Sequence, residues 1–288
     1  LTGCMFARIA AWFHAVSVAR KHVVNWPELV LKAILDSNGV FRSKAGGTLS
    51  CNGKALLRQL ARLESIWRFY GDALGVIRFE ETSLVIPNYF GREFRIPVNA
   101  WGVSPPKFFL KRYPFSVNGE VVLDIGAYLG DTPLMWLYRG AKSVIAVEPV
   151  PEHFQYLRKN VAGLPVIPLQ ASLGIQTPEI PSLIGSASYG IKEAENQTTD
   201  FLSTPIVSLI YLVNTYNPTV VKLNCEGCEH YVLDELALLP KYHVKHIAVQ
   251  FHPMKKIKLR DSLDFLEKKL GKGIVTRSSN DRVTVYWS

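Results

Sequence analysis

Two spacings of hydrophobic residues divide the chain. In residues 54–71, leucines and a tryptophan recur every three or four positions, which predicts a helix with one apolar face. Residues 76–100 change to short β-branched and aromatic runs separated by turn residues, which predict a small β-meander. Residues 1–75 as a whole are predicted to be helical, and residues 101–120, rich in proline and aromatic residues, read as a linker.

From residue 121 onward, continuous apolar runs alternate with amphipathic ones. Short apolar runs are typical of strands buried on both faces, and the amphipathic runs between them are typical of helices. Strands are predicted at 121–125, 143–147, 165–169, 219–223 and 245–251, a closing hairpin at 273–278 and 282–287, and helices beginning near 131, 151, 206, 228 and 259.

This alternation predicts an α/β fold with a Rossmann-like, mostly parallel sheet, an antiparallel hairpin at its C-terminal end, and a helical plus β-meander extension before it. The expected domains are 1–105 and 106–288. Sheets of this kind bind ligands at the carboxyl ends of their strands, so the residues that follow each strand are the first candidates for a site.

Composition and charge leave the class of partner open. The chain has 288 residues, of which 48% are hydrophobic and 20% charged, and this is ordinary globular composition. Its formal net charge of +9 favours acidic partners such as nucleic acid, phosphorylated sugars or anionic lipids. No run of five or more basic residues appears, so the alternative is that the positive charge only keeps the protein soluble.

The first 24 residues are apolar enough to suggest a membrane helix. Arg8, His14, Arg20 and Lys21 interrupt them, and a spanning helix needs about 20 consecutive apolar residues. We therefore expect no transmembrane segment, and an amphipathic helix that packs on the protein in preference to a membrane anchor.

The four cysteines are too few for a disulfide scaffold and predict a reducing, cytoplasmic compartment. Cys225 and Cys228 form a CxxC sequence without a second Cys or His pair of matching spacing, so no metal site is expected. Two small buried residues at a tight corner explain this pair, and metal or redox use is the alternative.

The sequence VLDIGAYLGDT (122–132) follows a predicted strand and opens a helix. Gly126 allows a tight turn and Gly130 allows close packing of helix on strand, as in dinucleotide-binding loops. Tyr128 stands where those loops have a further glycine, and its ring argues against a diphosphate ligand.

Two carboxylates end neighbouring strands of this region. Asp124 is costly at the end of an apolar strand unless it meets a cation or hydrogen-bond donors, and a ligand amino group would serve. Glu148 lies where an acidic residue can accept both hydroxyls of a ribose. Helix capping near Asp131 and Glu152 is the alternative. A ligand with an amino-acid end, a ribose and no phosphate is S-adenosylmethionine (SAM).

Together with VIAVEPVPEHFQYLRKN (144–160) and VVKLNCEGCEHYVL (220–233), this motif resembles the FkbM-type family of SAM-dependent methyltransferases over about residues 105–255. The last motif of that family reads roughly K-I-D-V-E-G-x-E. This chain keeps its lysine, both glutamates and its glycine, and it has Asn224 where the family has Asp.

The resemblance implies that the loop after Asp124 holds the methionine end of SAM, that Glu148 holds the ribose, and that residues 170–172 flank the adenine. It also implies that residues 1–105 form a substrate-contacting extension. The cofactor-binding residues expected on this basis are Asp124, Gly126, Ala127, Tyr128, Gly130, Asp131, Thr132, Glu148, Pro149, Ala171, Ser172 and Asn224.

The segment after residue 223 supplies candidates for acceptor chemistry. A hydroxyl acceptor is a weak nucleophile and benefits from a nearby base, for which Glu226, Glu229 and His252 are the candidates. His230 is expected to have no chemical role. Lys222 lies inside an apolar strand and is expected to pair with Glu226 or Glu229. A charge complementing a helix N-terminus is the alternative for Glu229.

The family resemblance favours O-methylation of a hydroxyl on a sugar, lipid or other metabolite. One alternative is a nucleic-acid methyltransferase, although the Asn-Pro-Pro-aromatic sequence of amino-directed enzymes does not follow the strand at 219–223. The other is a SAM-fold binding module without catalysis, which Asn224 keeps open.

Overall fold

The computed structural model describes residues 2–100, 103, 106–174, 204–254, 257–279 and 282–288. The chain divides into two compact units, Leu1–Lys107 and Phe108–Ser288, close to the boundary expected from the linker. None of the helices in these described stretches combines the length and the apolar character needed to cross a membrane.

The first unit contains more strand than its sequence predicts. The meander and the long helix before it are confirmed, but a hairpin of β1 and β2 interrupts the region predicted to be helical. Each strand of that hairpin has a single fully buried apolar residue, Phe41 or Leu49, so its alternation is faint. The elements are α1 (Thr2–His22), α2 (Trp26–Ile34), β1 (Asn38–Arg42), β2 (Thr48–Asn52), α3 (Gly53–Tyr70), η1 (Gly71–Leu74), β3 (Arg78–Glu80), β4 (Ser83–Tyr89) and β5 (Arg92–Pro97).

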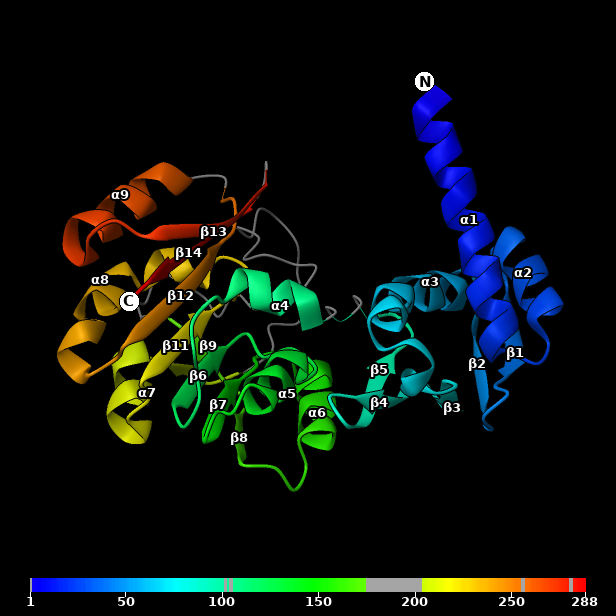
Figure 1. Cartoon of the computed structure of the whole chain (residues 1–288), viewed down its shortest axis with the longest axis horizontal. Helices are drawn as coiled ribbons and strands as arrows, with labels where there is room; N and C mark the ends of the chain where they lie inside the picture. The colour runs from blue at the N-terminus through cyan, green and yellow to red at the C-terminus, as the bar shows by residue number, and fades with distance from the viewer. Residues whose placement is uncertain (1, 101–102, 104–105, 175–203, 255–256, 280–281) are drawn as a thin grey trace. The chain divides into compact units, whose positions relative to one another are not determined.

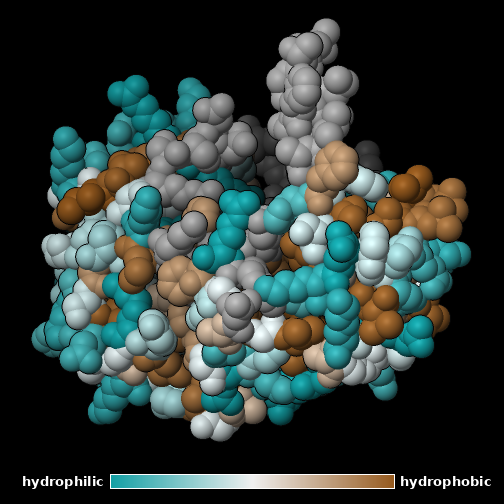
Figure 2. All heavy atoms as spheres, turned by 45° about the vertical axis from the view of Figure 1, so that its right-hand side comes forward, coloured by the Kyte–Doolittle hydropathy of each residue, from teal (hydrophilic) through white to brown (hydrophobic). Residues whose placement is uncertain are grey.

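Some large apolar side chains of this unit face solvent. Leu31, Ile34 and Leu35, on α2 and just after it, are each more than half exposed, as is Val40 on β1. Brown side chains accordingly gather at the right of Figure 2, where this unit lies.

The second unit is built on a seven-stranded sheet in the order β13-β14-β12-β11-β6-β7-β8 (Figure 1). Its first five strands in sequence run parallel, and β14 pairs antiparallel with both β12 and β13. The predicted α/β sheet with a C-terminal antiparallel hairpin is therefore confirmed. The strands are β6 (Val121–Ile125), β7 (Ser143–Val147), β8 (Val166–Leu169), β11 (Val220–Leu223), β12 (His246–Phe251), β13 (Ile274–Ser279) and β14 (Arg282–Trp287).

Helices cover both faces of this sheet. Leucines and valines of α7, α8 and α9 join one apolar core with alternate residues of β6, β11 and β12, while α4 and α5 lie on the opposite face (Figure 1). The helices are α4 (Pro106–Arg112), α5 (Asp131–Tyr138), α6 (Pro151–Asn160), α7 (Leu209–Tyr216), α8 (Leu233–Leu238) and α9 (Leu259–Leu270).

Three local predictions are wrong. The helix expected from residue 206 begins at Leu209, because Ile206–Val207 form β10 beside β9 (Ser172–Leu173). The segment predicted as a linker contains α4. The helix expected from residue 228 is broken into η2 (Cys228–Tyr231), α8 and η3 (Leu239–Tyr242).

Candidate functional site

A fully buried ion pair lies at the centre of the sheet. Lys222 on β11 lies beside Asp124 on β6 in the parallel register, and its Nζ is 2.7 Å from Asp124 Oδ1. Neither side chain is exposed. The expected pairing of Lys222 with Glu226 or Glu229 is therefore wrong, and the cation that Asp124 requires is Lys222.

The same lysine fixes the loop that follows β6. Its Nζ also donates to the carbonyls of Ile125 and Gly126, at 3.1 and 2.9 Å. Burial alone would lower the pKa of Lys222, but Asp124 raises that pKa above its ordinary value, so the side chain stays an ammonium. Trp136 Nε1 of α5 donates to the second carboxylate oxygen of Asp124 at 3.0 Å. Asp124 therefore holds the lysine and the tryptophan that support the loop. Its direct contact with a ligand stays a prediction.

Gly126 brings two loops into backbone contact. Its φ is +76°, and a Cβ built on it would lie 1.9 Å from the carbonyl oxygen of Asn224. Its N–H and that of Ala127 both donate to Val147 O, at 2.9 and 3.0 Å. Glycine is required here because the turn has a left-handed conformation and leaves no room for a side chain.

Glu148 gathers the second half of the loop. Its carboxylate accepts hydrogen bonds from the N–H groups of Tyr128 and Val150, both at 3.0 Å, and lies 3.3 Å from His153 Nδ1. Tyr128 has φ +53° and packs its ring edgewise on His153. A carboxylate has about four acceptor sites, so Glu148 keeps roughly one for a ligand hydroxyl.

The start of α5 completes this cradle. Gly130, at φ +97°, packs against Leu157 of α6, a helix and not the strand that the sequence suggested. Asp131 and Thr132 follow in the first turn and are more than nine-tenths buried. Thr132 Oγ1 has no hydrogen-bond partner among the described residues.

The predicted adenine side contains little polar chemistry. Ala171 is buried within the core, and Ser172 pairs with Ile206 in the short β9–β10 ladder. The carbonyl of Pro149 accepts from Thr204 Oγ1 at 3.1 Å. Apolar and backbone surfaces of this kind suit a flat base, and the assignment stays a prediction.

The expected SAM cofactor fits this arrangement. Thr132 Oγ1 and Asn224 Oδ1, at the two loops that Gly126 brings into contact, are buried without partners in the described part of the chain. Such atoms are costly unless a ligand satisfies them. The loop residues would hold the methionine end, and Glu148 would hold the ribose.

A strained corner follows β11. Glu226 has φ +57° and Gly227 φ +122°, and a disulfide between Cys225 and Cys228 closes the corner. The interpretation of these cysteines as two unreacted small residues is therefore wrong. The sequence spacing allows the bond, but a separation of three positions alone does not show that the two sulfurs meet.

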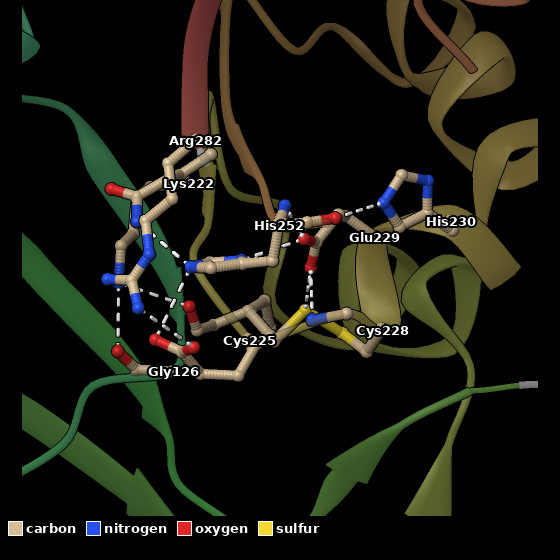
Figure 3. A network of polar contacts seen from close by, with 12 residues as sticks. Gly126, Lys222, Cys225, Cys228, Glu229, His230, His252 and Arg282 are labelled. Atoms are coloured by element: carbon tan, nitrogen blue, oxygen red, sulfur yellow. Dashed lines mark hydrogen bonds and ion pairs between the residues drawn. A yellow bond between two sulfur atoms is a disulfide. The ribbon is translucent and has the colours of Figure 1, made fainter. Parts of the chain in front are cut away.

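Glu229 and His252 hold the far side of this corner (Figure 3). Glu229 has no exposed surface and accepts from Gly227 N at 3.0 Å and from His252 N at 2.7 Å. His252 Nδ1 lies 2.8 Å from the same carboxylate. Glu229 therefore balances the positive charge of His252 and orients its ring. The Glu229 side chain is enclosed by the protein.

Glu226 lies on the open side of the corner. Its Oε1 is 3.3 Å from His252 Nε2, and its Oε2 is 3.7 Å from a nitrogen of Arg282. Burial by itself would lower the pKa of His252, but hydrogen bonds to Glu226 and Glu229 raise it to about 9. At neutral pH His252 is therefore an imidazolium, which excludes it as the general base.

Among the predicted catalytic residues, only Glu226 is accessible. Its side chain is 20% exposed, whereas those of Lys222 and Glu229 are fully enclosed and that of His252 is 4% exposed. His230 is buried between Ser262 Oγ and the carbonyl of His252, both at 2.7 Å, and so has a structural role.

Sequence reasoning missed several polar side chains that surround these groups. Trp136 and His153 support the two carboxylates, and Arg282 approaches Glu226. Trp136 could have been identified, since α5 begins directly after the loop and its sixth residue turns back over β6. Arg282 could not have been identified, because only the antiparallel pairing of β14 with β12 brings it near Glu226.

Solved methyltransferase structures show weak similarity to this chain. The T. thermophilus 16S rRNA N2 G1207 methyltransferase RsmC is 15% identical, over 72% of this chain and 50% of that chain, with a TM-score of 0.41. Precorrin-6y C5,15-methyltransferase from Geobacter metallireducens GS-15 is 12% identical, over 65% and 89%, with a TM-score of 0.39. This chain thus spans about half the length of the first of these.

None of the curated proteins matches the sequence significantly. The methyltransferase FkbM domain matches residues 124–272, which contain the Asp124 loop, Glu148 and the whole corner after β11. This match covers more than half of the chain, and the protein therefore belongs to the FkbM family of SAM-dependent methyltransferases.

Proposed function

We propose that this protein methylates a hydroxyl oxygen of a sugar, a lipid or another metabolite. The observation that carries the proposal is the accessible carboxylate of Glu226 at the carboxyl end of β11, beside the loop that fits SAM. The Glu226 carboxylate at this place can accept a hydrogen bond from an incoming hydroxyl.

SAM supplies an electrophilic methyl group when it is bound. The chain then has to hold the acceptor oxygen in line with that group, since positioning is the largest contribution a protein makes to such a displacement. The acceptor oxygen gains the methyl group and loses its proton. Glu226 is the residue that accepts this proton. The imidazolium of His252 and the guanidinium of Arg282 hold the Glu226 carboxylate in position.

Substitution of Glu148 tests the cofactor site. Glu148→Gln or Glu148→Ala is expected to weaken SAM binding by more than about tenfold, because the side chain organises the Tyr128 backbone and faces the ribose. Glu152→Gln, an exposed carboxylate at the start of α6, is the matched control and should leave the affinity unchanged. Equal calorimetric affinities in all three proteins would contradict the assignment.

Transfer of label identifies the acceptor. Protein incubated with methyl-labelled SAM and a fractionated lysate should label the glycan, lipid or metabolite fraction. Glu226→Gln should bind SAM normally and transfer much less label. Label found only in RNA, together with salt-sensitive RNA binding, would favour nucleic acid, the acceptor class suggested by the +9 charge. Tight SAM binding without label in any fraction would favour a binding module.

A further inference from the structure

Four buried polar atoms, two on the seven-stranded sheet and two at the end of α4, are not used by the cofactor site. They are Arg112 Nε, Tyr113 OH, Thr284 Oγ1 and one terminal atom of the Gln250 amide, and none has a hydrogen-bond partner among the described residues. All four residues are at least nine-tenths buried. Buried polar atoms without partners are unfavourable, so four of them together point to a ligand.

The register of the strands brings two of these residues together. Gln250 on β12 lies directly opposite Thr284 on β14. Ala248, two positions before Gln250, and Tyr286, two positions after Thr284, share the row of Lys222 and Asp124. Because side chains alternate along a strand, Gln250 and Thr284 face the same side as the buried ion pair, one row nearer the carboxyl edge.

The other two residues come from the end of α4, which lies in front of this side of the sheet (Figure 1). The carbonyl of Arg112 accepts from Thr276 Oγ1 at 2.8 Å, and that hydroxyl lies 3.4 Å from the carbonyl of Thr284. The ring of Tyr113 lies 5.0 Å from that of Trp136, whose Nε1 donates to Asp124. These contacts bring the C-terminal end of α4 beside the Thr284 backbone and beside α5.

This cluster adjoins the corner that holds Glu226. The side-chain amide of Gln250 lies 3.0 Å from His252 Nε2, and the same ring nitrogen is 3.3 Å from Glu226 Oε1. Because the imidazolium N–H donates, the amide oxygen of Gln250 accepts from it, and the amide NH2 is left for a ligand. A molecule in contact with Gln250 and Thr284 would thus have its next groups beside Glu226, on the acceptor side of the sheet.

Charge decides the class of ligand. Within the described residues Arg112 has no carboxylate partner, whereas the neighbouring buried cation Lys222 has Asp124. A guanidinium nitrogen that is buried without an acceptor or a counter-charge, as Arg112 Nε is, is unfavourable, and buried charges in proteins are normally paired. Arginine also binds carboxylate and phosphate groups with well-defined geometry.

We propose that Arg112, Tyr113, Gln250 and Thr284 form an acceptor subsite for an anionic group, either a carboxylate or a phosphate. This inference rests on the proposed function. Arg112 supplies the charge, the hydroxyls of Tyr113 and Thr284 donate to the anion, and the amide NH2 of Gln250 donates to a neighbouring oxygen. The acceptor is therefore a hydroxylated acid or phosphate ester, methylated on the hydroxyl nearest Glu226.

Titration with simple anions tests the subsite. The protein loaded with S-adenosylhomocysteine is titrated calorimetrically with sodium phosphate and with sodium acetate, with chloride at equal ionic strength as the reference. We expect phosphate or acetate, or both, to bind more tightly than chloride, and the preferred one identifies the anionic group. Arg112→Gln should weaken that binding by about tenfold or more, the effect of losing a charged hydrogen bond.

Two further variants support the reading. Thr284→Val removes one hydroxyl at nearly constant volume and should weaken anion binding severalfold. Arg260→Gln, whose side chain is 89% exposed, removes a positive charge elsewhere and should leave it unchanged. Anion affinity equal to that of chloride, or unaffected by Arg112→Gln, would overturn the proposal.

Two measurements separate this proposal from other roles of Arg112. Arg112→Gln should leave SAM affinity within about twofold of the parent, and a large loss would assign the arginine to the cofactor and overturn the subsite. Its ligand-free thermal midpoint should be equal or higher, because an unpaired charge is removed, and a clear fall would show a structural partner. The Glu148 variants report on the cofactor site independently.

Discussion

The two halves of the carboxyl edge of the sheet differ in how far their buried charged groups are satisfied. In the cofactor half, around β6 and β7, Asp124 and Glu148 are satisfied by Lys222, Trp136, backbone N–H groups and His153, and only the neutral atoms Thr132 Oγ1 and Asn224 Oδ1 lack partners among the described residues. In the acceptor half, around β12 and β14, the atoms without partners among the described residues include a nitrogen of a charged side chain, Arg112 Nε.

This difference separates buried groups that hold the fold from buried groups that are available to bind a ligand. The cofactor half uses its charges to hold a loop in a single conformation, so those charges contribute to folding as well as to binding. The acceptor half keeps its hydrogen-bonding capacity for a ligand, and the structure there is less stable than its burial alone suggests. Substitutions should therefore change stability most in the cofactor half and ligand binding most in the acceptor half.

The largest effect is expected from Lys222→Met. The substitution leaves Asp124 buried without its cation, which typically costs about 3–5 kcal/mol of unfolding free energy. Urea unfolding measures this loss. Lys245→Met is the control, because the Lys245 side chain is 57% exposed in its ion pair with Glu120 and should contribute less than about 1 kcal/mol. Similar losses for both lysines would remove the distinction between the two halves.

The charge of His252 gives the acceptor half its own pH dependence. The folded pKa of about 9 lies above the ordinary 6.5, so the stabilisation is complete below pH 6.5 and is lost as pH rises through about 9. At 1.36 kcal/mol per pKa unit, the decline is about 3 kcal/mol. Urea unfolding at a series of pH values should show it in the parent, and His252→Gln should lack that part of the slope. A parallel slope in the two proteins would show that His252 is neutral in the corner.

The sequence predicts the parallel sheet well because each of its central strands is a short apolar run between amphipathic ones. It does not predict the pairing of Lys222 with Asp124, since 98 residues separate them and only the register of β11 on β6 brings them together. The acceptor subsite is missed for the same reason, because α4, β12 and β14 contribute one or two residues each. The β1–β2 hairpin is missed because so few of its residues are buried.

Gly126 lies where the two halves meet. Gly126→Ala places a Cβ against the carbonyl of Asn224 and forces a left-handed alanine, so it should weaken both stability and SAM affinity. Gly163→Ala is a matched control, since Gly163 has φ +74° and open space around it. The excess cost at Gly126 over Gly163 is expected to be about 2 kcal/mol, within the range for overpacking. Equal costs in urea unfolding would mean that the Asn224 loop moves freely away.

The smallest effect is expected from reduction of the Cys225–Cys228 disulfide. Its ring closes over a sequence separation of only three, for which chain entropy gives at most about 2 kcal/mol. Dithiothreitol should lower the urea midpoint of the parent slightly and leave Cys225→Ser/Cys228→Ser unchanged. Cys51 should not interfere, because burial raises the pKa of its thiol to about 11. SAM affinity should be the same in both redox states, since the cofactor half is held by Lys222 and Glu148. A loss of SAM binding on reduction would show that the corner and the cofactor loop fold as one unit, joined through the contact between Gly126 and Asn224.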